Sequence, residues 1–325
     1  MDIKDYLSSC RPVVAPLLGY PGVHLNTSSI KGNVFDAAVQ ADTLLALDRR
    51  FGPDIRFTFM DLTAEAHAFG APVLYGEMES PSMAAHILHA RDDLEKLESR
   101  FSLEDERLQV YIDTVRRLRA SGVQKPIAAY VSGPFTLAGL LMGANDIALN
   151  TLLDPELVSS AVECAAGAIL SYAGALSGAG ADIIVILEPT AVMLSPEMYW
   201  EFSGTWTEKL VGDLRCFSVL HICGNTEYLI PGMCRTGADA LSLDSAVDLL
   251  SVASHIPKET GIIGNIDPVG VMCQKNPGEV RQRVLDLRRS MRDYDNFILS
   301  TGCDLPPETP LENISAFMEA GKAAL

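Results

Sequence analysis

Short apolar runs alternate with longer segments of helical period along the whole chain. We count eight such runs, at residues 13–17, 55–60, 127–131, 183–187, 218–221, 240–243, 261–264 and 297–300. The segments between them have the apolar spacing of amphipathic helices, as at residues 83–98, 105–120, 155–176, 196–210 and 277–291. Strands buried on both faces give nearly continuous apolar runs, so this alternation predicts parallel strands joined by helical crossovers.

The number of runs favours a closed barrel over an open sheet. Eight parallel strands with intervening helices match the (β/α)8 TIM barrel, which commonly fills a chain of 325 residues as one domain. A doubly wound open sheet is the main alternative, but no glycine fingerprint follows the first run and no shift of composition marks a second domain. We predict one TIM-barrel domain over residues 1–325. A further helical segment at 34–50 forms an N-terminal helical extension, which we expect to cover part of the rim or an end of the barrel.

Composition narrows the partners of this barrel. The chain carries 42 acidic and 25 basic residues, and its formal net charge of -17 repels nucleic acids and anionic membranes. The first thirty residues lack the pattern of a signal peptide, and no apolar stretch approaches the roughly 18 residues of a membrane span. We expect a cytoplasmic protein that binds neither nucleic acid nor membrane.

Soft metal ligands follow two of the runs. In a TIM barrel the active site lies at the carboxyl ends of the strands. The fifth run ends at His221, with Cys223 two positions on and pointing to the same side, and Cys303 follows the eighth run. One imidazole and two thiolates suit zinc, and three protein ligands leave a fourth tetrahedral position open, as in catalytic zinc sites.

Each of these three residues also has an ordinary structural explanation. A lone buried cysteine is usually a small core residue, and a lone histidine is usually a hydrogen-bonded one. Spacing and placement therefore leave zinc binding and core packing both open. The other thiols do not follow strand ends, and we interpret them as packing or incidental residues: Cys10, Cys164, Cys216, Cys234 and Cys273.

Acids and amides follow the remaining runs and predict an acidic pocket. We take Asp61 and Glu188 as candidate catalytic residues, and Asp244, Asn265 and Asp267 as candidate substrate-binding residues. Glu188 could fill the fourth zinc position when substrate is absent, or orient a ligand from behind. It could equally be a helix-capping or solvated acid beside Pro189.

The chain resembles the uroporphyrinogen decarboxylase superfamily over nearly its whole length. The motifs that carry this resemblance lie at residues 61–70, 133–137, 264–268, 302–306 and 309–310. Within the superfamily it is more similar to the zinc-dependent methylcobamide:coenzyme M methyltransferases, whose zinc ligands are a His-x-Cys pair and a later cysteine. Those ligands match His221, Cys223 and Cys303. The resemblance therefore implies a TIM barrel that binds zinc through this trio.

The decarboxylase branch is the alternative reading. Decarboxylases typically have a histidine near the position of Cys303, and an N-terminal segment with two arginines that grips the substrate carboxylates. The corresponding stretch here, from Arg11 to His24, offers one arginine, and buried carboxylates without cationic partners are costly. Asp61 does match the pyrrole-facing aspartate of the decarboxylases, so this alternative stays open.

The methyltransferase resemblance implies a thiol acceptor, a corrinoid donor and a resident zinc ion. The donor would be a methylcobamide carried on a partner corrinoid protein that docks over the carboxyl rim. Zinc would lower the pKa of a small-molecule acceptor thiol such as coenzyme M, and tetrahydrofolate is an alternative acceptor. A second alternative is a structural zinc ion in a barrel that serves only as a binding module.

Overall fold

The strands of the main sheet are all parallel. The computed structural model describes residues 3–122 and 124–324, and within them seven strands follow one another in the order β1-β4-β5-β6-β7-β8-β9. They are β1 Arg56–Phe57, β4 Ile127–Ser132, β5 Ile183–Leu187, β6 Phe217–Ile222, β7 Ala240–Leu243, β8 Gly261–Ile266 and β9 Phe297–Thr301. Each coincides with one of the predicted runs from the second to the eighth.

The first predicted run closes this sheet into a barrel. Val14 forms a parallel bridge with Leu299 of β9, where the Ala15 amide donates to the Leu299 carbonyl at 2.9 Å. On its other side, the Asp54 amide donates to the Val14 carbonyl at 3.0 Å, just before β1. The predicted (β/α)8 barrel is therefore confirmed, although its first strand is reduced to this single bridge.

Alternate residues of the strands pack into two separate cores. In β5, Ile183, Val185 and Leu187 join the cluster inside the barrel, whereas Ile184 and Ile186 join the larger cluster under the helices. This is the arrangement expected of strands that are buried on both faces. The interior of the barrel is therefore packed with side chains, and a binding site can form only at one of its ends.

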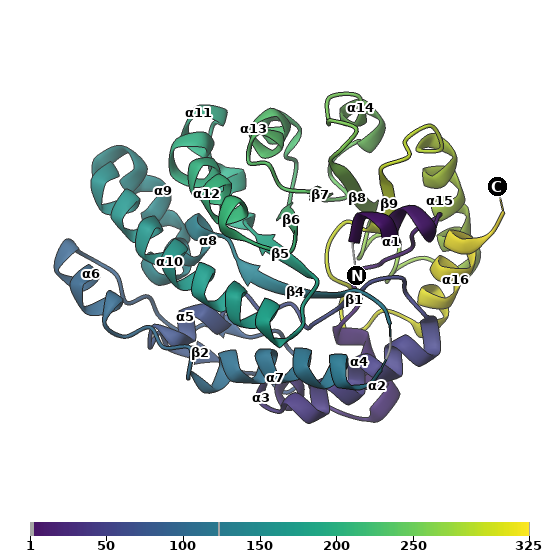
Figure 1. Cartoon of the computed structure of the whole chain (residues 1–325), viewed down its shortest axis with the longest axis horizontal. Coiled ribbons are helices and arrows are strands. Elements are labelled where there is room, and N and C mark those ends of the chain that lie inside the picture. The colour runs from purple at the N-terminus through teal and green to yellow at the C-terminus, as the bar shows by residue number, and fades with distance from the viewer. Residues whose placement is uncertain (1–2, 123, 325) are drawn as a thin grey trace.

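Helices surround the strands on the outside (Figure 1). The α-helices are α1 Ile3–Ser9, α2 Val23–Asn26, α3 Ile30–Phe35, α4 Ala37–Phe51, α5 Ala64–Ala68, α6 Arg91–Glu98, α7 Glu106–Ala120, α8 Pro134–Met142, α9 Ala144–Leu153, α10 Pro155–Ala179, α11 Pro196–Tyr199, α12 Thr205–Asp213, α13 Ile230–Arg235, α14 Leu249–Ala253, α15 Pro277–Ser290 and α16 Leu311–Lys322. Short 3-10 turns lie at η1 Tyr20–Gly22, η2 Pro189–Met193 and η4 Glu227–Leu229. The predicted helices at 105–120, 155–176 and 277–291 correspond closely to α7, α10 and α15.

The predicted helix at 83–98 is wrong over its first half. The helix α6 begins only at Arg91, because the Asp93 carboxylate accepts from the His89 and Ala90 amides and sets the first turn there. Before it, the amides of Ile87 and Leu88 donate to the Leu141 carbonyl, at 2.8 and 3.0 Å. These long-range bonds replace the helical ones.

A small antiparallel hairpin precedes α6 and was not predicted. It pairs β2 Val73–Leu74 with β3 Ser82–Met83, and we call residues 73–83 the hairpin. Its strands are two residues long each, too short to leave a period-2 pattern in the sequence.

The predicted helix at 196–210 is interrupted by a π-helical segment. Residues Trp200–Gly204 form this segment, η3, between α11 and α12. It turns the Ser203 hydroxyl inward, where it donates to Glu188 at 2.9 Å. Such π-helical segments occur mostly near functional sites. This one places Ser203 against Glu188, the residue that caps a neighbouring helix.

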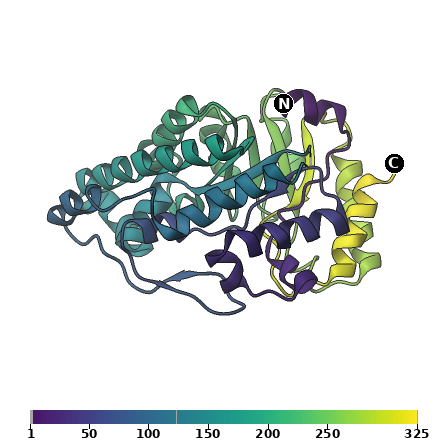
Figure 2. The ribbon, with the colours of Figure 1, turned by 60° about the horizontal axis from the view of Figure 1, so that its bottom comes forward.

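The predicted segment 34–50 lies mostly on the outside of the barrel. Asp36 accepts from the Ala38 and Val39 amides, at 2.7 and 3.2 Å, and so divides the segment into α3 and α4. The helix α4 packs against α7 and α16 on the outside of the barrel. The helix α1 instead covers the end of the barrel at which the strands begin, and its Ile3 side chain packs into the interior core. The helices α1 and α16 lie on the same side of the molecule (Figure 2).

One helix, α10, is long and apolar enough to cross a membrane by length and composition alone. Half of its apolar window is buried against the rest of the described chain, and core helices of soluble proteins pass the same test. Its length therefore carries little weight as a sign of a membrane span.

Candidate metal centre and the adjoining cavity

Two barrel strands bring a histidine and two cysteines to one point at the carboxyl rim. His221 lies near the end of β6, and Cys223 follows that strand directly. Gly224 then takes a φ of 88°, which turns the chain away in a conformation that side chains rarely adopt. Cys303 follows β9 across the barrel. The sequence placed these residues at strand ends, and the fold brings them together.

The spacing of the three ligand atoms suits a tetrahedral zinc ion. The His221 Nε2 lies 3.0 Å from the Cys223 Sγ, and the two Sγ atoms of Cys223 and Cys303 lie 3.6 Å apart. All three ligand atoms lie within 4.8 Å of one another. Ligands about 2.0–2.3 Å from a tetrahedral zinc ion are about 3.3–3.8 Å apart. The sulfur–sulfur distance falls within this range and the nitrogen–sulfur distance is about 0.3 Å shorter, so the donor set fits zinc in chemistry and needs only a small adjustment in spacing.

A serine on the next strand fixes the orientation of the imidazole. His221 is in register with Ser242 of β7, and its Nδ1 lies 3.0 Å from the Ser242 Oγ and 3.2 Å from the Ser242 carbonyl oxygen. A hydrogen bond from Nδ1 to this carbonyl leaves the Nε2 lone pair directed at the two thiols. Ser242 lies inside an apolar run, so nothing in the sequence distinguished it from a core residue.

Contacts within the trio favour the thiolate form of Cys303. A hydrogen bond from Cys223, with the charge of the His221 imidazole, holds the pKa of Cys303 well below its usual range. The pKa of Cys223 is raised because its thiol donates to Cys303. Burial alone would lower the pKa of His221, but its contact with the Cys303 thiolate raises it overall. A metal ion at this site would therefore displace protons from Cys223 and His221.

Glu188 makes the contacts of a helix-capping acid. Its carboxylate accepts from the Phe135 and Thr136 amides at 2.9 and 2.8 Å, at the first turn of α8, and from Ser203. The side chain is fully buried, and burial raises its pKa. Of the described residues, only His221, Cys223 and Cys303 form a metal-ligand cluster, so Glu188 is not placed as a fourth ligand. Its assignment as a catalytic residue stays a prediction.

The Asp61 carboxylate accepts four hydrogen bonds from three residues. Its Oδ1 accepts from the Thr63 amide and hydroxyl at 2.8 and 2.7 Å. Its Oδ2 accepts from Tyr111 at 2.9 Å and from the guanidinium of Arg107. A carboxylate has about four lone-pair sites, and these bonds fill them. Asp61 therefore has no free acceptor for the N–H groups of a pyrrole, which weakens the decarboxylase reading.

The three candidate substrate-binding residues fix the loops around the trio. Asp244 accepts from the Ala246 amide at 2.8 Å, and Asn265 donates to the Asp244 and Val247 carbonyls at 2.9 and 2.7 Å. Asp267 likewise accepts from the two amides that open the loop after β8. Asp244 is close enough that its charge raises the pKa of His221. Contact of these three residues with a substrate stays a prediction.

A cavity of about 350 Å³ adjoins the trio on the Cys303 side. It is lined by Tyr20, Met60, Asp61, Leu62, Ser80, Pro81, Asp304, Leu305, Pro306 and Pro307. We call this the rim cavity. Asp304 follows Cys303 directly, its Oδ2 has no hydrogen-bond partner, and burial raises its pKa well above the usual range. Asp304 lies within the motif at residues 302–306 but was not singled out, and Tyr20 has no local signal, because only the fold shows which residues near a strand end line a cavity.

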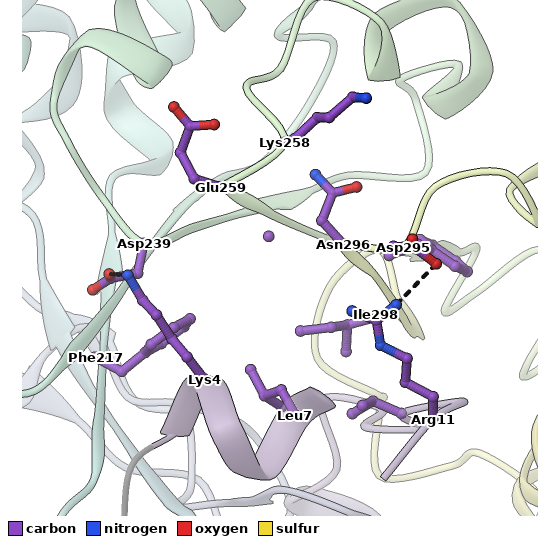
Figure 3. Close-up of a pocket in the computed structure, with 13 residues that line it drawn as sticks. Lys4, Leu7, Arg11, Phe217, Asp239, Lys258, Glu259, Asp295, Asn296 and Ile298 are labelled. Atoms are coloured by element: carbon purple, nitrogen blue, oxygen red, sulfur yellow. Dashed lines mark ion pairs between the residues drawn. The ribbon is translucent and has the colours of Figure 1, made fainter. Parts of the chain in front are cut away.

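A second cavity, of about 170 Å³, lies under α1 at the opposite end of the barrel (Figure 3). Its edges carry two ion pairs, Lys4 with Asp239 and Arg11 with Asp295, both at 2.9 Å. The amino ends of TIM-barrel strands contribute to stability, whereas active sites lie at the carboxyl ends. We therefore take the rim cavity and the trio as the candidate site.

Comparison with known proteins identifies relatives over most of the chain. A family model for uroporphyrinogen decarboxylase (URO-D) matches residues 25–324. The methylcobamide:CoM methyltransferase MtbA of Methanosarcina acetivorans is 30% identical over 269 residues, which cover 81% of this chain and 77% of that protein. A uroporphyrinogen decarboxylase of Prochlorococcus marinus is 28% identical over 287 residues, covering 85% of this chain and 80% of the relative.

A solved structure has the same fold over almost the whole chain. The methyltransferase from Methanosarcina mazei superposes with a TM-score of 0.85 and covers 95% of this chain and 93% of its own. Its sequence is 22% identical, so the likeness bears on the fold alone.

Proposed function

The chain belongs to the uroporphyrinogen decarboxylase (URO-D) family, and we propose that it is a zinc-dependent methyltransferase that moves a methyl group from a protein-bound methylcobamide to a small-molecule acceptor. The observation that carries this proposal is the His221, Cys223 and Cys303 cluster, which opens beside a cavity at the carboxyl rim. A thiol such as coenzyme M is the acceptor we favour, and tetrahydrofolate is the alternative. We further propose that the protein acts in the cytoplasm.

The residues of the trio would hold the zinc ion in defined roles. His221 would bind through Nε2 while Ser242 holds its other nitrogen, and Cys223 and Cys303 would bind as thiolates. When bound, zinc would lower the pKa of an acceptor thiol so that it reacts as a thiolate at neutral pH. Three protein donors leave room for one more ligand, which supports a catalytic rather than a structural site.

The rest of the site would orient the acceptor and exclude water. The rim cavity, beginning at Asp304 beside Cys303, would receive the body of the acceptor. With a thiol acceptor, its sulfur would take the methyl group of the methylcobamide substrate, and the electron pair of the broken Co–C bond would remain with the corrinoid. The proton of the acceptor thiol goes to solvent before this step. No residue of the trio needs to act as an acid or a base.

Exposed apolar side chains at the carboxyl rim support docking of a corrinoid protein. Among the described residues, the most exposed large apolar side chains all follow the carboxyl end of a strand. Each lies before, or within the first turn of, the helix that leads back to the next strand. They are Phe35, Leu74, Met78, Leu149, Leu152, Leu153, Met193, Tyr228, Leu250 and Val269. Exposed apolar surface concentrated at one end of a molecule is typical of a protein-binding face.

The proposal is tested by assaying zinc-loaded protein with methylcobalamin and either coenzyme M or tetrahydrofolate. We expect the absorbance of methylcobalamin to fall as the methyl group leaves, with a methylated acceptor as product. Cys303→Ser should lose most of its zinc, by metal analysis, and lose transfer. Cys273→Ser is the matched control, because this thiol contacts Thr309 rather than the trio, at 3.2 Å from its hydroxyl oxygen.

Four results would count against the proposal. No demethylation with any acceptor by zinc-loaded protein would refute methyl transfer, and turnover of uroporphyrinogen without metal would instead support the decarboxylase alternative. Zinc content that is unchanged in Cys303→Ser would remove the proposed metal site. X-ray absorption that shows four protein ligands would favour the structural-zinc reading.

A further inference from the structure

We propose that Arg107 is a positioning residue that holds the hairpin (residues 73–83) in place as a wall of the rim cavity, by linking the Tyr75 ring to Asp61. The link consists of a buried ion pair on one side and a cation–π contact on the other. Its effect on the hairpin is independent of the reaction, whereas its effect on acceptor binding rests on the proposed function.

The guanidinium of Arg107 is completely buried between charged and aromatic partners. It pairs with Asp61, and its Nε donates to the Val34 carbonyl at 2.8 Å. Its Cζ lies 4.8 Å from the centre of the Phe35 ring and 5.0 Å from that of Tyr75. The two rings touch each other edge to face, with centres 4.7 Å apart. A cation between rings is attracted to both, and more strongly where water is excluded.

This contact is one of a few attachments of the hairpin to the barrel. None of residues 73–83 is buried, and Leu74 and Met78 are among the most exposed apolar residues. Besides the ring contacts, the Lys31 amide donates to the Glu77 carbonyl at 3.3 Å near the turn. At the second strand, Ser80 is hydrogen-bonded to Tyr20 and Met83 packs against the core. The ion pair of the same two residues is exposed and 3.8 Å long, so it contributes little. A segment with so few buried contacts opens locally at low cost.

The hairpin also forms part of the surface that an acceptor would meet. Ser80 and Pro81 line the rim cavity together with Asp61 and Asp304. Asp61 is therefore both a wall of the cavity and the anchor of Arg107. Loss of the link would make Ser80 and Pro81 more mobile relative to the opposite wall. A cavity with a mobile wall binds its ligand more weakly, because the wall must be ordered on binding.

Variants of Tyr75 and Arg107 separate the link from general stability. Tyr75→Leu removes the ring and leaves the buried ion pair intact, whereas Tyr75→Phe keeps the ring and loses only a hydroxyl that has no hydrogen-bond partner. Arg107→Met removes the cation. We expect amide hydrogen exchange across residues 73–83 to become about tenfold faster in Tyr75→Leu and Arg107→Met, and to stay at the wild-type rate in Tyr75→Phe.

Arg56→Met is the matched control for loss of a buried arginine. Arg56 is 2% exposed and pairs with Asp48 at 3.0 Å, away from the hairpin. It should lose stability as Arg107→Met does, with no faster exchange in residues 73–83. If Arg107→Met does not fold, the two Tyr75 variants still decide the result.

The kinetic arm uses methylcobalamin as donor and coenzyme M or tetrahydrofolate as acceptor, whichever the wild type methylates. We expect Tyr75→Leu to raise the KM for the acceptor about tenfold with little change in kcat, because the link positions the cavity wall and touches no reacting atom. Unchanged exchange in residues 73–83 of Tyr75→Leu would overturn the proposed link. Faster exchange with an unchanged KM would overturn its role in acceptor binding. If the wild type methylates no acceptor, the proposed function fails, while the exchange result still decides the link.

Discussion

Buried carboxylates in this barrel differ in the partners that compensate for their burial. Asp61 has the charged partner Arg107. Glu65 has neutral donors, the Ser132 amide at 2.6 Å and the Ser132 hydroxyl at 3.2 Å. Glu188 is held by backbone amides and a serine. Hydrogen bonds from neutral groups do not offset the loss of water completely, so burial raises the pKa of Glu65 to about 7 and also raises that of Glu188.

The raised pKa of Glu65 predicts a pH-dependent stability. The folded protein keeps the proton of Glu65 up to about pH 7, whereas the unfolded chain releases it near the usual value of 4.5. The folded state therefore binds more protons in this window, and the contribution of Glu65 to stability falls as the pH rises from 4.5 through 7. A shift of this size corresponds to at most about 3 kcal/mol. Urea unfolding at pH 5, 6, 7 and 8 should show this loss in the wild type.

Glu65→Gln should remove that part of the pH dependence, because the amide does not titrate. Glu104→Gln is the control, since Glu104 is exposed and its substitution should leave the pH profile unchanged. Parallel profiles for the wild type and Glu65→Gln between pH 5 and 8 would contradict the prediction. Comparing slopes rather than absolute stabilities removes the effect of the changed hydrogen bond to Ser132.

The residues of the site were predictable from sequence only where their position along a strand is informative. His221, Cys223 and Cys303 have unusual chemistry at strand ends, and both features can be read in one dimension. Arg107 lies within α7, 46 residues from its partner Asp61, where an arginine normally belongs to a solvated face. Its burial follows from the packing of α3 and the hairpin around it. That packing leaves no local pattern.

At the scale of elements, side-chain caps decide where the helices begin. The helices α4 and α15 begin where an aspartate or asparagine accepts from free amides of the first turn, and α6 begins where Asp93 accepts from the two amides that precede the helix. The helix α8 has no such residue at its own start, and Glu188 reaches it from the end of β5 instead. The cap of α8 therefore comes from tertiary structure, and it depends on close contact between Gly133 and Glu188.

Gly133→Ala tests this contact. A Cβ at position 133 would overlap the buried Glu188 carboxylate, and the backbone φ of -78° offers no other obstacle to alanine. We expect Gly133→Ala to lower the free energy of unfolding by about 1–3 kcal/mol, as overpacking in a core does. Gly174→Ala on α10 is the control, because a Cβ there meets nothing within 4 Å. That change should stabilise the protein by up to about 1 kcal/mol through helix propensity.

Chemical denaturation of the two variants measures both effects with opposite signs. A Gly133→Ala protein as stable as the wild type would mean that Glu188 can leave the helix terminus at no cost. The capping role of Glu188 would then have to be abandoned.

Strands were predicted more accurately than helices, and for a physical reason. A strand inside a barrel is buried on both faces, so its apolar run is bounded sharply by polar loops, as in β5 and β7. A surface helix is identified by a periodic pattern, and that pattern continues across a break. Asp36 divided one predicted helix and the π segment Trp200–Gly204 divided another, while the apolar period ran through both.

At the scale of the whole molecule, closure of the barrel depends on joining the first strand to both chain ends. Asp54 lies at this junction. Its Oδ2 accepts from the Val14 amide at 2.7 Å, its Oδ1 accepts from Lys322 of α16 at 3.2 Å, and its carbonyl accepts from the Tyr6 hydroxyl of α1 at 2.9 Å. One residue thus links the short first strand to the first and last helices. Without Asp54, the single bridge at Val14 would hold the first strand only weakly.

Asp54→Ala should weaken the attachment of the first strand, because the amide of the completely buried Val14 would lose its hydrogen-bond acceptor. An unsatisfied buried amide costs about 1–3 kcal/mol, and we expect a loss of this size in the free energy of unfolding. Asp295→Ala is the control on the same side of the barrel. Its ion pair with Arg11 has an aspartate that is 93% exposed, so no measurable change is expected. Amide exchange at Val14 should also become faster in Asp54→Ala. Equal stabilities of the two variants would mean that the helices, rather than the contacts of Val14, hold the barrel closed.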